Sequence, residues 1–250
     1  MRTFFRIPLL TLGLLGAGLA LAQTPAPSPA PARKAAGAAA KQTPAPAGSA
    51  EPSTEREKTL YAMGVMLGLP VSSLDLKDED LVWIRQGLSD SAGGRSLRVP
   101  LESFAPKVSD FTQSRLAEVA SLEAAKDSVV VQREAARPGT VRHPSGLLYR
   151  ETKAGTKPGP GKTGKVFVAY TGTLTDGTVF DTSRSLGRPI VFDLEKVIPC
   201  WRNALPLMKA GGQARIVCPP SLAWGNVGNP PRIRPGATVI YDIELVEVLK

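Results

Sequence analysis

Few side chains in this sequence are suited to covalent or metal-based chemistry. The only histidine, His143, precedes Pro144 in a connecting segment. The sequence therefore argues against a catalytic triad with a histidine base, and it also argues against a histidine-rich metal site. The two cysteines, Cys200 and Cys218, form no C-x-x-C motif and have no third ligand nearby in the sequence, which argues against a metal or redox role. We expect no cofactor and no metal ion, and most hydrolase chemistry is disfavoured.

The last hundred residues contain the aromatic and strand-forming residues that could build a binding site. Val239, Tyr241, Ile243 and Leu245 alternate along one face of the last run, so one side of a sheet must be buried. The only helical stretch available to cover that side is 197–208. We therefore predict an α+β domain in which an antiparallel sheet wraps over one short helix. The strand-like runs, separated by turn residues, are 147–149, 165–172, 190–194, 213–218 and 238–248.

Five blocks of this region carry a specific resemblance to a known family. Their sequences are VAYTGTLTDGTVFDTS at 168–183, VIPCW at 197–201, MKAGG at 208–212, AWG at 223–225 and PGATVIYDIEL at 235–245. In this composition and order they resemble FKBP-type peptidyl-prolyl cis/trans isomerases. The resemblance implies the FKBP-like fold and an enzyme that rotates X-Pro peptide bonds.

Rotation about an X-Pro bond must cross a barrier of roughly 20 kcal/mol, because the twisted amide loses its resonance. No bond is broken, so the catalyst needs no nucleophile. It needs a pocket that holds proline and favours the twisted amide over the planar one. Apolar walls that exclude water, helped by a well-placed polar group, can supply this preference.

The resemblance assigns a role to each candidate site residue. Trp201 would form the pocket floor, although in an unrelated α+β domain such a residue would be plain core. The amide of Ile198 would bond the substrate carbonyl, and Asp181 would lie against Tyr170; the alternative for Asp181 is a turn or cap residue after a strand. The remaining wall and substrate-contact residues would be Phe180, Tyr241, Ile190, Phe192, Val197, Trp224 and Ile233.

Several positions depart from the usual family pattern. Ile190 replaces a second wall phenylalanine, Trp224 replaces a tyrosine whose hydroxyl donates a hydrogen bond, and Tyr241 replaces a phenylalanine. Each change keeps an apolar body, and the Trp224 indole N–H can still donate, but its larger ring narrows the mouth of the pocket. Asn229 stands where some members have histidine, and the loop after it contains Arg232 and Arg234. We expect retained activity, altered substrate preference and weaker binding of macrolide inhibitors.

The same resemblance brings the two cysteines together. In the family's fold the positions of Cys200 and Cys218 are close, so we predict a disulfide between them, with two buried thiols as the alternative. Two cysteines in an exported protein are usually bridged.

The N-terminus predicts export. Residues 1–22 contain Arg2 and Arg6, an apolar run of about 15 residues and a terminal Ala-Leu-Ala, which is typical of a cleaved signal peptide. An uncleaved anchor is the alternative, but the run is short of the roughly 20 residues that span a bilayer. There is no cysteine at the cleavage point to which a lipid could be attached. We therefore expect a periplasmic or secreted protein without stable membrane insertion. Residues 23–50 are rich in Ala and Pro and predict a disordered linker.

Residues 51–137 predict a helical N-terminal domain. Thr54 to Glu57 resembles a capping box that begins a first helix, and a second helix around 81–88 ends near Gly93. Leu101 and Phe104 suggest a short third helix. Residues 109–136 contain no Pro or Gly and predict one long helix of roughly 40 Å, whose apolar stripe is either covered by a partner or solvated. The segment loosely resembles the dimerisation module of periplasmic FKBPs, which implies a homodimer; packing of these residues within one chain is the alternative.

The charge and these motifs leave three functional hypotheses. The net charge of +9 falls to +7 once residues 1–22 are removed, yet the basic residues are scattered, so we expect no nucleic-acid partner. The leading hypothesis is an isomerase that accelerates folding of proline-containing exported polypeptides. The first alternative is a dimeric holdase chaperone with little turnover, and the second is a surface adhesin that uses the basic face.

Overall fold

The computed structural model describes residues 51–249. The expected signal peptide, 1–22, and the expected linker, 23–50, lie outside the described residues. Among the helices of residues 51–249, none combines the length and the hydrophobicity that a bilayer-spanning segment needs.

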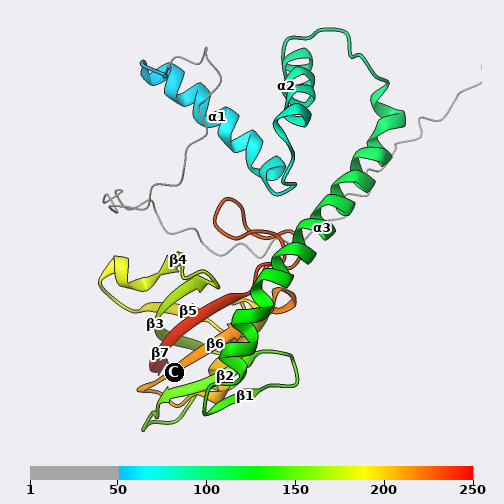
Figure 1. Cartoon of the computed structure of the whole chain (residues 1–250). Helices are drawn as coiled ribbons and strands as arrows, with labels where there is room; N and C mark the ends of the chain where they lie inside the picture. The colour runs from blue at the N-terminus through cyan, green and yellow to red at the C-terminus, as the bar shows by residue number, and fades with distance from the viewer. Residues whose placement is uncertain (1–50, 250) are drawn as a thin grey trace, which may run out of the picture. The chain divides into compact units, whose positions relative to one another are not determined.

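The C-terminal part of the described chain is built on one antiparallel sheet (Figure 1). Its strand order is β1-β2-β6-β7-β3-β4, and β5 pairs with β3. Five of the seven strands match predicted runs, and the two short strands β1 and β4 were not predicted. The strands are β1 (Thr140–Arg142), β2 (Leu148–Lys153), β3 (Lys165–Leu174), β4 (Val179–Thr182), β5 (Ile190–Asp193), β6 (Gly212–Cys218) and β7 (Val239–Leu249).

One short helix covers the inner face of this sheet, as predicted. Helix α4 (Pro199–Ala204) continues into a 3-10 turn at Leu205–Leu207, and both pack into the main hydrophobic core. Along β7 the residues Val239, Tyr241, Ile243 and Leu245 are buried, because successive side chains of a strand point to opposite faces. The expected α+β class is therefore confirmed.

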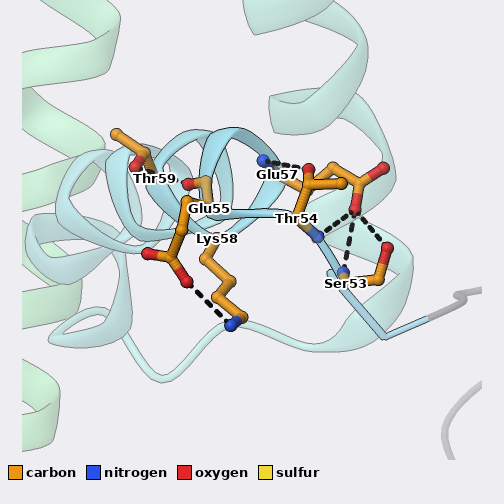
Figure 2. A network of polar contacts seen from close by, with 6 residues as sticks. All are labelled: Ser53, Thr54, Glu55, Glu57, Lys58 and Thr59. Carbon is orange, nitrogen blue, oxygen red and sulfur yellow. Dashed lines mark hydrogen bonds and ion pairs between the residues drawn. The ribbon is translucent and has the colours of Figure 1, made fainter.

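The first helix, α1 (Glu55–Ser72), begins with the predicted capping box. Figure 2 shows the carboxylate of Glu57 accepting bonds from Ser53 and from the backbone N–H of Thr54, while the Thr54 hydroxyl accepts from the Glu57 N–H at 3.1 Å. These bonds, led by the one from Thr54, lower the pKa of Glu57 to about 2. Helix α2 (Asp78–Ala92) follows and ends at Gly93, also as predicted.

The prediction of a separate short helix before the long one was wrong. Leu101 and Phe104 belong to the same helix, α3 (Leu101–Ala135), which runs without interruption for 35 residues. Pro106 lies near its start, where the missing N–H removes a single bond to the preceding turn. An early proline therefore did not end the helix.

The C-terminal half of α3 packs on the outer face of the sheet. Val130, Val131 and Ala135 contact a small core formed by Leu148, Val217 and Ile240 of strands β2, β6 and β7, and Figure 1 shows this half of α3 running alongside the strands. Glu134, which is 3% exposed, accepts from Arg215 at 3.2 Å. The chain's own sheet therefore covers one face of this stretch, while Leu122 and Val129 stay exposed.

Candidate active site

Trp201 is the centre of an aromatic cluster on the inner side of the sheet. Its ring centroid lies 5.0 Å from that of Tyr170, 5.1 Å from Phe192 and 5.2 Å from Tyr241. All three pairs meet edge to face, the geometry that aromatic quadrupoles favour. A second group, Phe180 with Trp224 and Tyr241, extends the cluster at 5.8 and 5.6 Å. Three strands, β3, β5 and β7, thus direct rings onto the first turn of α4.

Local sequence explains where Trp201 lies. Ile198 is the residue before a proline and takes an extended conformation, with φ −57° and ψ 151°. Pro199 then starts α4 with a φ that already suits a helix. The predicted disulfide is present: Cys200 is bonded to Cys218 of β6, with a Cα–Cα distance of 5.7 Å. This bond ties the turn that carries Trp201 to the sheet.

The Tyr170 hydroxyl donates a hydrogen bond of 2.7 Å to Oδ2 of Asp181. Asp181 lies within β4 and is paired with Gly172 of β3, so it is a strand residue and not the turn or cap residue of the alternative. Burial, together with the bond to Asp181, raises the pKa of Tyr170 above its usual value. The hydroxyl therefore stays protonated and remains a donor.

The predicted site residues lie together in the structure. Some of their side chains are buried and others are partly exposed. Tyr170, Trp201, Tyr241 and Val197 are buried, with Trp201 4% exposed. The indole Nε1 of Trp201 has no hydrogen-bond partner among the described residues. Ile233, at 1% exposed, lies in the same core and is the most deeply buried of the predicted substrate contacts. The partly buried members are Phe180, Ile190, Phe192, Ile198 and Trp224.

Two residues support this cluster without having been assigned a role from the sequence. A Cβ on Gly172 would stand 2.7 Å from atoms of both the Phe180 and Tyr241 rings, so only glycine fits there. The buried hydroxyl of Ser183 accepts from the backbone N–H of Tyr170 at 2.8 Å. Both lie in the block at 168–183, and their position in that block was the only available signal.

The comparisons with known proteins agree with this geometry. Residues 155–246 match the family described as FKBP-type peptidyl-prolyl cis-trans isomerase. The chain is 35% identical over 209 residues to "Outer membrane protein MIP" of Legionella longbeachae, covering 79% of this chain and 88% of that protein.

Two further similarities involve FkpA, an FKBP-type peptidyl-prolyl cis-trans isomerase of Escherichia coli. The K12 sequence is 32% identical over 205 residues, covering 77% of this chain and 75% of the relative. The crystal structure of E. coli FkpA matches with a TM-score of 0.55 at 32% identity, covering 78% of this chain and 97% of that one. The chain therefore belongs to the FKBP family and is a peptidyl-prolyl cis/trans isomerase.

Proposed function

We propose that this isomerase acts on proline-containing segments of exported polypeptides, and that the aromatic cluster around Trp201 is where the prolyl bond rotates. The observation that carries the proposal is the convergence of the Tyr170, Phe192 and Tyr241 rings on Trp201, all edge to face. No nucleophile or metal is needed for this chemistry, because the reaction rotates a bond and breaks none.

In the proposed mechanism the proline ring of the substrate rests on the floor formed by Trp201. The N–H of Ile198 has no acceptor among the described residues, and it would donate to a substrate carbonyl. That bond fixes the chain on one side of the rotating amide. The apolar walls exclude water, which favours the twisted amide because its nitrogen and carbonyl have lost the charge separation of the planar form.

Asp181 and Tyr170 act together in this mechanism. The carboxylate of Asp181 fixes the Tyr170 hydroxyl through the 2.7 Å bond, and the Tyr170 ring in turn contacts Trp201 at 5.0 Å. Their bond spans β3 and β4, so it also fixes the wall formed by Phe180. We assign Asp181 the role of orienting the wall and presenting a negative potential to the rotating amide.

The loop that carries Trp224 would set substrate and inhibitor preference. Trp224 meets Phe180 edge to face at 5.8 Å and is partly buried. An indole here occupies more of the mouth than the family's tyrosine and presents its donor at a different place. These differences support the proposed change in substrate preference and the weaker binding of macrolides.

We further propose that residues 1–22 direct export and are removed, and that 23–50 form a linker to the helical domain, 51–137, and the isomerase domain, 138–250. The Cys200–Cys218 disulfide supports a periplasmic or secreted location, because disulfides persist in oxidising compartments. A relative named as an outer membrane protein is consistent with it.

Homodimerisation through the N-terminal helices is part of this proposal. Helix α1 is 18 residues long and buries none of them in the described chain. Its exposed large side chains include Tyr61, at 66%, and Met66, at 70%, and Trp83 of α2 is 70% exposed. Stable soluble proteins cover apolar surface of this kind, so a second copy is the expected partner. Light scattering coupled to size-exclusion chromatography should give twice the chain mass; the monomer mass would contradict this part.

The experiment that tests the proposed site is exchange NMR on an X-Pro peptide with the full chain and its Trp201→Leu variant. The wild type should exchange the cis and trans signals at catalytic concentrations, and the variant should lose most of this activity while keeping its far-UV circular dichroism. A folded variant with full activity would show that the prolyl bond rotates elsewhere.

A further inference from the structure

Helix α3 contributes a buried carboxylate that contacts the end of β3 and the start of β7, two strands that carry site residues. Asp127 is 2% exposed, and both of its oxygens are used. Oδ2 accepts from the backbone N–H of Thr238 at 2.6 Å, and Oδ1 accepts from the hydroxyl of Thr175 at 2.5 Å. A buried charge is tolerated when it is hydrogen-bonded in this way. From these contacts we infer that Asp127 is a positioning residue for the isomerase site.

The two partners of Asp127 flank the segments that carry the site. Thr175 follows the last residue of β3 and begins the turn into β4, which bears Phe180 and Asp181. Thr238 directly precedes β7, which bears Tyr241, and it ends the loop that carries Trp224. One side chain of α3 therefore joins the turn after β3 to the start of β7, which are neighbours at this end of the sheet.

A second observation shows how closely this loop approaches α3. Gly236 has a φ of +73°, and a Cβ placed on it would come within 2.4 Å of the Cα of Ala120. Two residues earlier, the guanidinium of Arg234 lies 3.6 Å from the carboxylate of Glu123. Ala120, Glu123 and Asp127 follow one another at helical spacing, so one stripe of α3 contacts the returning arm of the loop.

The hydrogen bonds of Asp127 fix the positions of the segments that carry the site residues, and Asp127 itself takes no part in the reaction. Removing the carboxylate leaves the buried N–H of Thr238 without an acceptor, and that segment is then free to shift. Displacements of about 1 Å can lower catalytic rates by as much as a hundredfold. Loss of Asp127 should therefore reduce turnover in a protein that is still folded. The inference rests on the site proposed above.

Glu134 offers a matched control on the same helix. It is 3% exposed, it lies two turns beyond Asp127, and it also binds the sheet, through Arg215 at 3.2 Å. Its contacts are to the outer face and to Arg137 at 3.1 Å, and none reaches the turn after β3 or the loop before β7. Glu134→Ala should lower stability without changing the rate at which the folded protein acts.

The test measures kcat and KM for an X-Pro peptide in the full chain at a temperature where every variant is folded by near-UV circular dichroism. Asp127→Ala should lower kcat/KM about tenfold, mainly through kcat, and Glu134→Ala should leave it within a factor of two. Asp127→Asn should recover most of the activity. Its amide oxygen can accept from Thr238 while its NH2 group donates to the Thr175 hydroxyl.

Thr175→Val carries the same test if Asp127→Ala does not fold, because it removes one hydroxyl and keeps the side-chain shape; a two- to threefold loss is expected. A folded Asp127→Ala with wild-type kcat/KM, or a Glu134→Ala with the same loss as Asp127→Ala, would overturn the inference. A wild type without isomerase activity would instead contradict the proposed site, so the two failures are distinguishable.

Discussion

Tyr170 and Asp181 are joined across neighbouring strands by a 2.7 Å hydrogen bond from the phenol to the carboxylate. Tyr170 belongs to β3 and Asp181 to β4, and the pairing of Gly172 with Asp181 sets their register. Because the Tyr170 ring also contacts Trp201, this bond connects β4 to the buried indole at the centre of the aromatic cluster.

Asp181→Ala should therefore lower kcat/KM on the order of tenfold, since a hydrogen bond to a charged group contributes about 1.5–3 kcal/mol. Exchange NMR on an X-Pro peptide measures the effect. Asp193→Ala is the matched control, because that carboxylate ends β5 and is 3.7 Å from Lys196, outside the aromatic cluster. Equal activity of the two variants would show that Asp181 has no part in the reaction.

The buried tyrosines predict a particular response to alkaline pH. Burial raises the pKa of Tyr149 to about 12 and raises those of Tyr170 and Tyr241 further above the usual value. In the unfolded chain these phenols ionise near pH 10. The stability that they contribute is complete below about pH 10 and is lost as the pH rises toward the folded values.

Tyrosinate absorbance measures this response directly. In a Tyr61→Phe background, which removes the exposed fourth tyrosine, the folded protein should show little tyrosinate at pH 11, and ionisation should coincide with unfolding. Ionisation of most of these phenols at pH 11 in the still-folded protein, as expected for an exposed tyrosine with a pKa near 10, would contradict the burial of these rings.

The disulfide should contribute stability and not chemistry. Cys200 and Cys218 are both fully buried and are separated by 18 residues, so cross-linking should stabilise the fold by about 3 kcal/mol. A Cys200→Ala, Cys218→Ala variant should unfold at a correspondingly lower urea concentration while retaining isomerase activity when folded. An unchanged urea midpoint would show that the cross-link does not constrain the unfolded chain.

Trp224 should control macrolide binding. Trp224→Tyr restores the hydroxyl donor that the family usually has in this loop, so the Kd for a macrolide inhibitor should fall several-fold. Calorimetric titration gives the Kd, and Trp83→Tyr, which changes an exposed residue of α2, is the control. Identical Kd values for wild type and Trp224→Tyr would contradict the role assigned to Trp224.

Much of the catalytic domain could be predicted from the sequence because its strands are long and alternate. Along β7, the alternation of Val239, Tyr241, Ile243 and Leu245 indicates which side chains face inward. Strands β1 and β4 are short and contain no buried residue, so they have no apolar alternation to detect, and their pairing with β2 and β3 defines them. The site roles came from the resemblance, since nothing in the spacing alone separates Trp201 from a core residue.

The contacts of α3 could not be predicted for a different reason. From the sequence, Asp127 is expected to be an exposed polar residue of a solvated helix. Its hydrogen-bond partner Thr238 lies 111 residues away in the chain. Likewise, the small residues Ala120 and Gly236 carry no signal of a close approach. Tertiary packing determines such contacts, so they cannot be predicted from the local pattern of a single sequence.

The central claim is that prolyl rotation takes place over the indole of Trp201. Refolding of a substrate protein limited by a slow proline phase, which takes tens of seconds unassisted, tests this claim most directly. The wild-type full chain should accelerate that phase at substoichiometric concentration, and folded Trp201→Leu should be at least about tenfold less effective. Equal acceleration by the two proteins, or none by the wild type, would contradict the account.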